Sequence, residues 1–224
     1  MKKIFLLLTL LLCTSMDWEY DVEVDGIYYF LNQSNKTAQV ASYYDENIFT
    51  EDGDLCIPES ISVEGTIYVV TSLGNWCFSG CTGLTSITIP NSVTSLGGGC
   101  FQNCARLESI EVESENTVYD SRENCNAIIE TSSNTMIAGC KNTTIPNSVT
   151  SLGEWCFREC RGLANIKMKS STPPSTGSGA FSDCLRLTTV YVPKGAKSAY
   201  NVSPWNRYDI VAQPTNPVGR VYGR

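Results

Sequence analysis

The feature that most constrains the fold of this chain is an internal repeat. Three segments align without a gap, and they run over Cys77–Ile89, Cys100–Val112 and Cys156–Met168. A fourth segment begins at Ala180-Phe181 and keeps the same spacing of apolar residues. The shared pattern is C/A-F-x-x-C-x-x-L-x-x-I-x-I/V. Self-similarity at a period of roughly 20–50 residues predicts a repeat architecture, so the repeat has to be explained before any single motif.

The repeat predicts a solenoid of stacked coils. Its step is 23 residues from Leu84 to Leu107 and 24 residues from Leu163 to Leu187. The L-x-x-I-x-I/V stretch alternates apolar and polar residues, which favours a short strand with one face inward. The C-F-x-x-C spacing suits a single helical turn. Because no coil can bury its apolar side alone, the coils have to stack into one core. The expected fold class is therefore α/β but β-rich, a leucine-rich-repeat solenoid with short parallel strands and single helical turns.

The other segments predict the ends and one irregularity of the stack. The 56 residues from Leu107 to Leu163 amount to one step of 23 and one longer coil of 33, which we expect over about residues 113–145. A stack of this kind also needs caps at its two ends. The expected division is a strand-rich N-terminal cap with a first degenerate coil at 16–73, repeats at 74–192, a C-terminal cap at 193–212 and a loose tail at 213–224.

Residues 1–15 predict a signal peptide for export. Lys2 and Lys3 precede an apolar run from Ile4 to Cys13. This run is about half as long as the roughly 20 apolar residues that a membrane-spanning helix needs. Small residues favour cleavage after Ser15. The expected location is therefore extracellular or at the cell surface, and contact with a membrane is expected only if Cys13 is lipidated.

The combined repeat resembles that of a known family. Units of the form Gly-x-x-Cys-Phe-x-x-Cys-x-x-Leu-x-x-Ile-x-Ile-Pro are similar to BspA-like leucine-rich repeats of bacterial surface proteins. The start at Asp25–Tyr29 and the finish at Tyr191–Gly195 also resemble the ends of that family. The resemblance implies an exported, non-enzymatic protein that in some members adheres to host proteins or other cells. One departure is that Cys77, Cys100 and Cys156 stand where the family often has Ala.

Composition argues against several classes of function. The chain has a formal net charge of −7, a sequence pI of about 4.7 and no histidine. Nucleic acid is not an expected partner, because phosphate binding needs clustered Lys and Arg. Without His, the Ser-His, Cys-His and His-metal sites are missing, so we expect no catalysis, metal or cofactor. Acidic clusters at 45–46 and 51–54 are interpreted as solvated loops rather than a glycosidase pair or a calcium loop.

The 11 cysteines leave three interpretations open. The first is core packing, because free Cys is among the most buried residue types. The second is disulfide formation, since stacked strands lie about 4.8 Å apart and exported chains can be oxidised. The disulfides that fit are Cys77–Cys100 and Cys81–Cys104 across coils, and Cys125–Cys140 in the long coil. Metal binding is least favoured, because C-x-x-x-C lacks the spacing of a zinc knuckle.

The outward positions of the predicted strands form the candidate binding surface. Polar side chains there are expected to line up in rows across coils, and such a sheet surface is the usual place for a partner. The first row is Ser86, Ser109, Asn165 and Thr189, and the second row is Thr88, Glu111, Lys167 and Tyr191. Trp76 and Trp155 hold equivalent turn positions, where they are interpreted either as partner anchors or as covers of the core. Gly99 at the same position indicates that this slot need not be filled.

Together these features predict an exported binding module of the adhesion type. Its expected partner is a protein or a glycan on host or neighbouring cells, engaged through the outward rows. The alternative is a structural envelope or spacer protein without a defined ligand. An enzyme is disfavoured, because the usual catalytic constellations lack their histidine.

Overall fold

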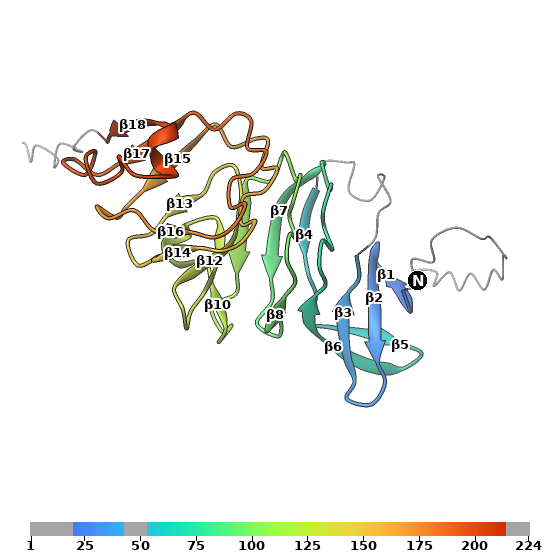
Figure 1. Ribbon diagram of the computed structural model, residues 1–224. Coiled ribbons are helices and arrows are strands. Elements are labelled where there is room, and N and C mark those ends of the chain that lie inside the picture. Colours follow the sequence, from blue (N-terminus) through green and yellow to red (C-terminus); the bar gives the residue numbers. More distant parts are fainter. Residues whose placement is uncertain (1–19, 43–52, 214–224) are drawn as a thin grey trace, which may run out of the picture.

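The structure is a computed structural model that describes residues 20–42 and 53–213. These residues form eighteen β-strands and two short 3-10 helices, with no α-helix among them. Figure 1 shows the strands following one another along the molecule, from the N-terminal hairpins to β18. The described chain is β-rich, as the repeats predict, but the helical part of the expected α/β class is wrong for these residues.

The first sheet contains six strands and begins the stack. They are β1 (Val22–Val24), β2 (Ile27–Asn32), β3 (Thr37–Val40), β5 (Ser60–Val63), β6 (Thr66–Leu73) and β8 (Ser95–Leu96). The hairpins β1–β2 and β5–β6 turn at Asp25-Gly26 and Glu64-Gly65, where all four residues have φ between 49° and 83°. Two consecutive left-handed residues give the type I′ turn, whose twist matches that of paired strands. Both β3 and β8 pair with β6 in parallel, which joins the hairpins to the repeats.

Two further sheets hold the L-x-x-I-x-I segments as parallel strands. One sheet consists of β4 (Gly53–Cys56), β7 (Leu84–Ile89) and β9 (Ser109–Val112), and the other of β13 (Thr144–Ile145), β15 (Asn165–Met168), β17 (Thr189–Val192) and β18 (Asp209–Ala212). The register pairs Ile87 with Ile110 and Ile166 with Val190. These four side chains are at most 2% exposed. Equivalent residues of successive repeats therefore lie side by side, with the apolar side of each strand in the core.

The long coil interrupts this arrangement. It contains β10 (Tyr119–Asp120), the 3-10 helix η1 (Arg122–Asn124), β11 (Ala127–Glu130) and β12 (Thr135–Gly139). These strands form a five-stranded sheet with β14 (Ser151–Leu152) and β16 (Ser175–Thr176), in the order β10-β11-β12-β14-β16. Because β11 and β12 form an antiparallel hairpin, β9 and β13 do not pair with each other. The repeat strands consequently fall into two separate sheets.

The C-F-x-x-C segments are turns, which corrects the expectation of single helical turns. In the first repeat Trp76 has φ of 54° and Gly80 has φ of 80°, values that an α-helix does not allow. The N–H groups of Trp76, Phe78 and Gly80 donate to carbonyls of the next coil at 2.9–3.0 Å. Those of Ser79 and Cys81 donate three residues back along the chain. Every second backbone N–H group thus donates to the neighbouring coil and is not available for a hydrogen bond within a helix.

Phenylalanine rings form two stacks in the core. The ring centroids of Phe78 and Phe101 lie 5.9 Å apart, and those of Phe157 and Phe181 lie 5.2 Å apart, with the planes within 9° of parallel in both pairs. The end of β12 passes between the two stacks, where Gly139 faces the Phe157 ring. The long coil thus places a bare backbone where other repeats place an aromatic ring.

Aromatic side chains also close the C-terminal end of the stack. The 3-10 helix η2 (Trp205–Arg207) precedes β18 and buries Trp205, which is 1% exposed. The indole N–H donates to the Pro174 carbonyl at 3.3 Å, and the Tyr200 hydroxyl donates to the Ser170 carbonyl at 2.9 Å. The polar tips of both rings are satisfied, so the rings can be buried without a lost hydrogen bond.

We expect Gly139→Ala to destabilise the fold. A Cβ at this position would overlap the ring of Phe157, which stacking on Phe181 holds in place. Adding volume to a packed core costs about 1–3 kcal/mol, so the midpoint of urea unfolding should fall. Gly98→Ala is the control, because a Cβ there meets no atom closer than 3.7 Å. Equal losses in the two variants would contradict this packing.

Candidate functional site

The strand face is the outward side of the two parallel repeat sheets, β4-β7-β9 and β13-β15-β17-β18. The structure brings the predicted residues of the two rows together in pairs. The pairs are Ser86 with Ser109 and Thr88 with Glu111 in the first sheet, and Asn165 with Thr189 and Lys167 with Tyr191 in the second. Each predicted row of four is therefore divided between two sheets.

The strand face also carries polar residues that the repeat pattern did not single out. Between the two sheets, Asn126 accepts a hydrogen bond from Ser109 Oγ at 3.3 Å and donates to the Asn142 carbonyl at 3.4 Å. Residues that extend the rows in register are Asp54 beside Ser86, Thr144 beside Lys167, and Asp209 beside Thr189. The degenerate match of 55–58 to 87–90 is a signal that could have located Asp54. Asn126 lies in the long coil outside the repeat pattern, whereas Thr144 precedes Ile145 as Thr88 precedes Ile89, a match that could have placed it in the second row.

The predicted acidic clusters are described only at Asp54. Its carboxylate accepts hydrogen bonds from Ser86 at 2.7 Å and Thr85 at 2.9 Å, and these bonds lower the pKa of Asp54. Asp54 is thus an ordered member of the strand face. Residues 45–46 and 51–52 lie outside the described residues. Within 20–42 and 53–213, no three His, Cys, Asp or Glu side chains are grouped so that they could hold a metal ion.

A hollow opens in the strand face beside Lys167. It has a volume of about 320 Å³ and lies between one coil that contributes residues 141–144 and the next coil. The lining residues are Lys141, Asn142, Thr143, Thr144, Gly162, Ala164, Asn165 and Lys167. Two of the predicted site residues, Asn165 and Lys167, are therefore part of a defined concave surface.

The two lysines of the hollow differ in their electrostatic environment. Lys141 forms an ion pair with Glu108, with Nζ 2.7 Å from Oε1. Lys167 is exposed and has no ion-pair or hydrogen-bond partner for its side chain among the described residues. Because none of the eight lining residues is acidic, the ammonium of Lys167 is available to a ligand.

Both predicted tryptophan anchors cover glycines of a neighbouring coil. A Cβ at Gly99 would lie 2.5 Å from Cδ1 of Trp76, and a Cβ at Gly179 would lie 2.7 Å from Cδ1 of Trp155. Gly99 needs no side chain of its own at this turn position, because the Trp76 ring occupies the space where that side chain would lie. Trp76 still keeps 39% of its surface exposed, and the Arg158 guanidinium lies 5.5 Å from the Trp155 ring centroid.

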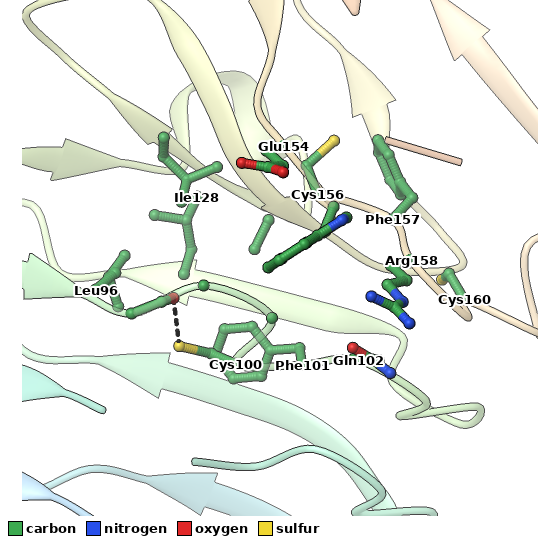
Figure 2. Close-up of a pocket in the computed structure, with 17 residues that line it drawn as sticks. Leu96, Cys100, Phe101, Gln102, Ile128, Glu154, Cys156, Phe157, Arg158 and Cys160 are labelled. Carbon is green, nitrogen blue, oxygen red and sulfur yellow. Dashed lines mark hydrogen bonds between the residues drawn. The ribbon is translucent and has the colours of Figure 1, made fainter. Parts of the chain in front are cut away.

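A second hollow lies between coils (Figure 2). Trp155 is one of its lining residues. Its volume is only about 90 Å³, room for a few water molecules. In Figure 2, Arg158 and Gln102 lie near each other on one side, and Ile128 lies across from them. The buried thiol of Cys100 is part of the lining, where it donates to a backbone carbonyl at 2.9 Å. Its size makes this hollow less suited to a partner than the one on the strand face.

The ten described cysteines are free, so the disulfides considered from the sequence are not formed in this part of the chain. Nine are buried, and Cys56 on β4 is exposed. Cys104 and Cys184 donate to carbonyls of the preceding coil at 3.0 and 2.8 Å. Burial raises the pKa of Cys160 to about 12 and that of Cys184 to about 11. These thiols therefore stay protonated in the core at neutral pH. They are poor nucleophiles, because only the thiolate is a strong nucleophile.

The predicted export signal cannot be located in the structure. Residues 1–15, with Cys13 and the cleavage site after Ser15, lie outside the described residues, as does the tail from residue 214 onward. Across 20–42 and 53–213, no helix has the length and apolar character needed to cross a membrane. Export therefore stays a prediction from the sequence.

We expect Cys56 to react with iodoacetamide before the buried repeat cysteines do. At pH 8 the exposed thiol is accessible, whereas Cys77 and Cys160 are buried and burial raises their pKa. Mass spectrometry of peptides from the native, unreduced protein should show alkylation at Cys56 alone among these three. In denaturant all three should react. Fast native labelling of Cys160, or a disulfide that includes it, would contradict the core-packing role.

Several solved structures are similar to this chain. A leucine-rich repeat protein from Bacteroides ovatus is 25% identical with a TM-score of 0.45, over 78% of this chain and 48% of that protein. One from Bacteroides capillosus is 23% identical with a TM-score of 0.43, over 78% of this chain and 99% of that one. The pneumococcal vaccine antigen PcpA is 13% identical with a TM-score of 0.41, over 75% and 69% of the two chains. This chain matches about half the length of the Bacteroides ovatus protein.

The family is shown by the sequence itself. No curated protein matches the chain significantly. A family model described as the BspA type leucine-rich repeat region matches with six copies, over residues 55–137 and 130–203. These two regions together cover well over half of the 224 residues. The chain belongs to the BspA-type leucine-rich repeat family.

Proposed function

We propose that this chain is an exported, non-catalytic binding module of the cell surface that contacts a protein or glycan partner through its strand face. The observation that carries this proposal is the hollow at Lys167, which offers a free ammonium and polar side chains on an open sheet surface. Family membership, the N-terminal signal pattern and the missing histidines support it. In this proposal residues 74–192 form one solenoid of 23–24-residue coils, with one extended coil at about 113–145, between two caps.

The arrangement of Lys167 and Tyr191 supports a role in recognition. The two residues are directly paired in register on β15 and β17, and their neighbours Ile166 and Val190 are fully buried. The outward side chains are therefore held by a rigid backbone. A rigid tyrosine next to a free cation is a common kind of binding anchor, because little conformational entropy is lost when a partner binds.

A second candidate function is structural self-association, and one observation favours it. On the outer face of the first sheet, Ile67 is 64% exposed, Val69 is 42% exposed and Phe30 is 38% exposed. Apolar residues gathered on one face are typical of association sites. Under this alternative the purified chain should form multimers, which light scattering would detect, and an Ile67→Lys variant should remain monomeric.

For the binding module, we expect Lys167→Ala/Tyr191→Ala to lose most partner binding without loss of fold. The purified chain from Met16 onward, without the predicted signal peptide, would be used to retrieve partners from extracellular matrix, mucin and bacterial surface extracts. A band specific to the wild type and lost in the double variant is the expected result. Circular dichroism and thermal unfolding should be unchanged, because both side chains point away from the core.

Lys194→Ala/Lys197→Ala is the matched control for charge. Both lysines are exposed and lie beyond β17, outside the two rows. Equal loss of the band in this variant would assign binding to net charge rather than to the strand face. Unchanged binding by the Lys167→Ala/Tyr191→Ala variant would refute the proposed surface.

A further inference from the structure

The hollow in the strand face arises where a repeat lacks a side chain. In the other repeats the residue after the column leucine is Thr85, Glu108 or Thr188, whereas here it is Ala164. Gly162, on the other side of the leucine, is small for a different reason, because a Cβ there would collide with the backbone carbonyl of Ala105. The coil backbone stays in place, because Leu163 and Ile166 are fully buried. The short side chain of Ala164 therefore leaves an open space of about 320 Å³ rather than a collapsed surface.

Four of the six polar side chains around this space are unused by the protein, whereas the Thr143 hydroxyl donates to the Asn126 carbonyl at 2.7 Å and Lys141 pairs with Glu108. The side chains of Asn142, Thr144, Asn165 and Lys167 have no hydrogen-bond partner among the described residues. They come from two coils, and the register places Thr144 beside Lys167. Three neutral side chains with both donor and acceptor capacity thus surround one cation. The second cation among the eight lining residues, Lys141, is already paired with Glu108.

These groups match one class of ligand. A single free ammonium suits a single carboxylate, because a charge-assisted hydrogen bond is roughly twice as strong as a neutral one. Amide and hydroxyl side chains suit neighbouring hydroxyl groups, which can both donate and accept. Tyr191 adjoins Lys167 on the next strand, where its ring can cover the apolar face of a pyranose. An acidic peptide would also supply a carboxylate, but its backbone offers separate N–H donors and C=O acceptors rather than several hydroxyl groups that each donate and accept beside that carboxylate.

We propose that this hollow binds an acidic saccharide, with its carboxylate on Lys167 and its hydroxyl groups on Asn142, Thr144 and Asn165. This inference rests on the proposed function and names the partner chemistry of the same surface. The carboxylated sugar can be a sialic acid at the end of a glycan or a uronic acid within a polysaccharide. Both present one carboxylate and several hydroxyl groups on a six-membered ring.

The test is an NMR titration of the ¹⁵N-labelled chain from Met16 onward, without the predicted signal peptide. Sialyllactose and trigalacturonic acid are added in separate titrations. Lactose is the neutral control, and a glutamate-rich peptide represents the acidic-peptide alternative. We expect amide shifts confined to residues 141–144 and 162–167 with at least one acidic sugar, and none with lactose. The sugar that shifts these amides identifies which of the two sources the site recognises.

Variants then test the assigned contacts. Lys167→Ala should weaken binding about tenfold or more through loss of the charge-assisted bond. Ala164→Glu should abolish binding, because it fills the hollow with a negative charge, and it should still fold, since Glu108 holds the same position in another repeat. Lys197→Ala and Thr82→Glu, at exposed positions outside the hollow, should bind as the wild type does.

The outcomes separate this inference from the broader function. Shifts at the hollow with the glutamate-rich peptide alone, or none with either acidic sugar, would overturn the saccharide proposal. If partners are still retrieved from the extracts in a way that depends on Lys167 and Tyr191, only the saccharide proposal fails and the proposed binding module stands. If neither extracts nor sugars bind, both proposals fail and self-association takes their place.

Discussion

The backbone ladder between successive turns is the interaction on which the rest of this structure depends. The N–H groups of Trp155, Phe157 and Glu159 donate to the following coil at 2.8–3.1 Å, as their equivalents do in the first repeat. On the other side of each coil, parallel strands make the usual ladder. A buried N–H without a partner is costly, so a coil is satisfied only when its neighbour is present. This coupling forces equivalent residues into columns and lets Phe157 stack on Phe181.

The sequence predicted the strands correctly and the turns incorrectly, for a physical reason. Alternation around Ile87 and Ile166 has a single structural solution when one side must be buried. The C-F-x-x-C spacing fits both a helical turn and a chain of tighter turns. What decides between them is the positive φ at Trp76 and at Glu159, of 54° and 53°. Trp and Glu do not favour that conformation. Gly80, Gly99 and Asn103, which hold the same two positions in other repeats, do favour it and also have positive φ. The aligned repeats therefore carried a signal for the turns that the C-F-x-x-C spacing missed.

The candidate surface was predictable within each sheet but not across the whole stack. Spacing alone placed Lys167 beside Tyr191 and Thr88 beside Glu111, and the register agrees. It could not show that the hairpin β11–β12 and the helix η1 would separate β9 from β13, because that segment lacks the repeat. Nor could one repeat show that Gly99 accommodates Trp76, since that fit depends on the neighbouring coil.

A fold held by its backbone in this way changes how a binding surface can arise. Where side-chain packing alone holds a fold together, removing a side chain lets neighbouring residues move into the space it leaves. Here the backbone hydrogen bonds between successive coils hold each coil in place. Ala164 in place of Thr or Glu can therefore leave an open hollow. The chain as a whole is acidic, with a net charge of −7, so its overall electrostatic field disfavours an anion. Selectivity for a carboxylate then depends on two features of the hollow: the ammonium of Lys167 and the lack of acidic side chains among the eight lining residues.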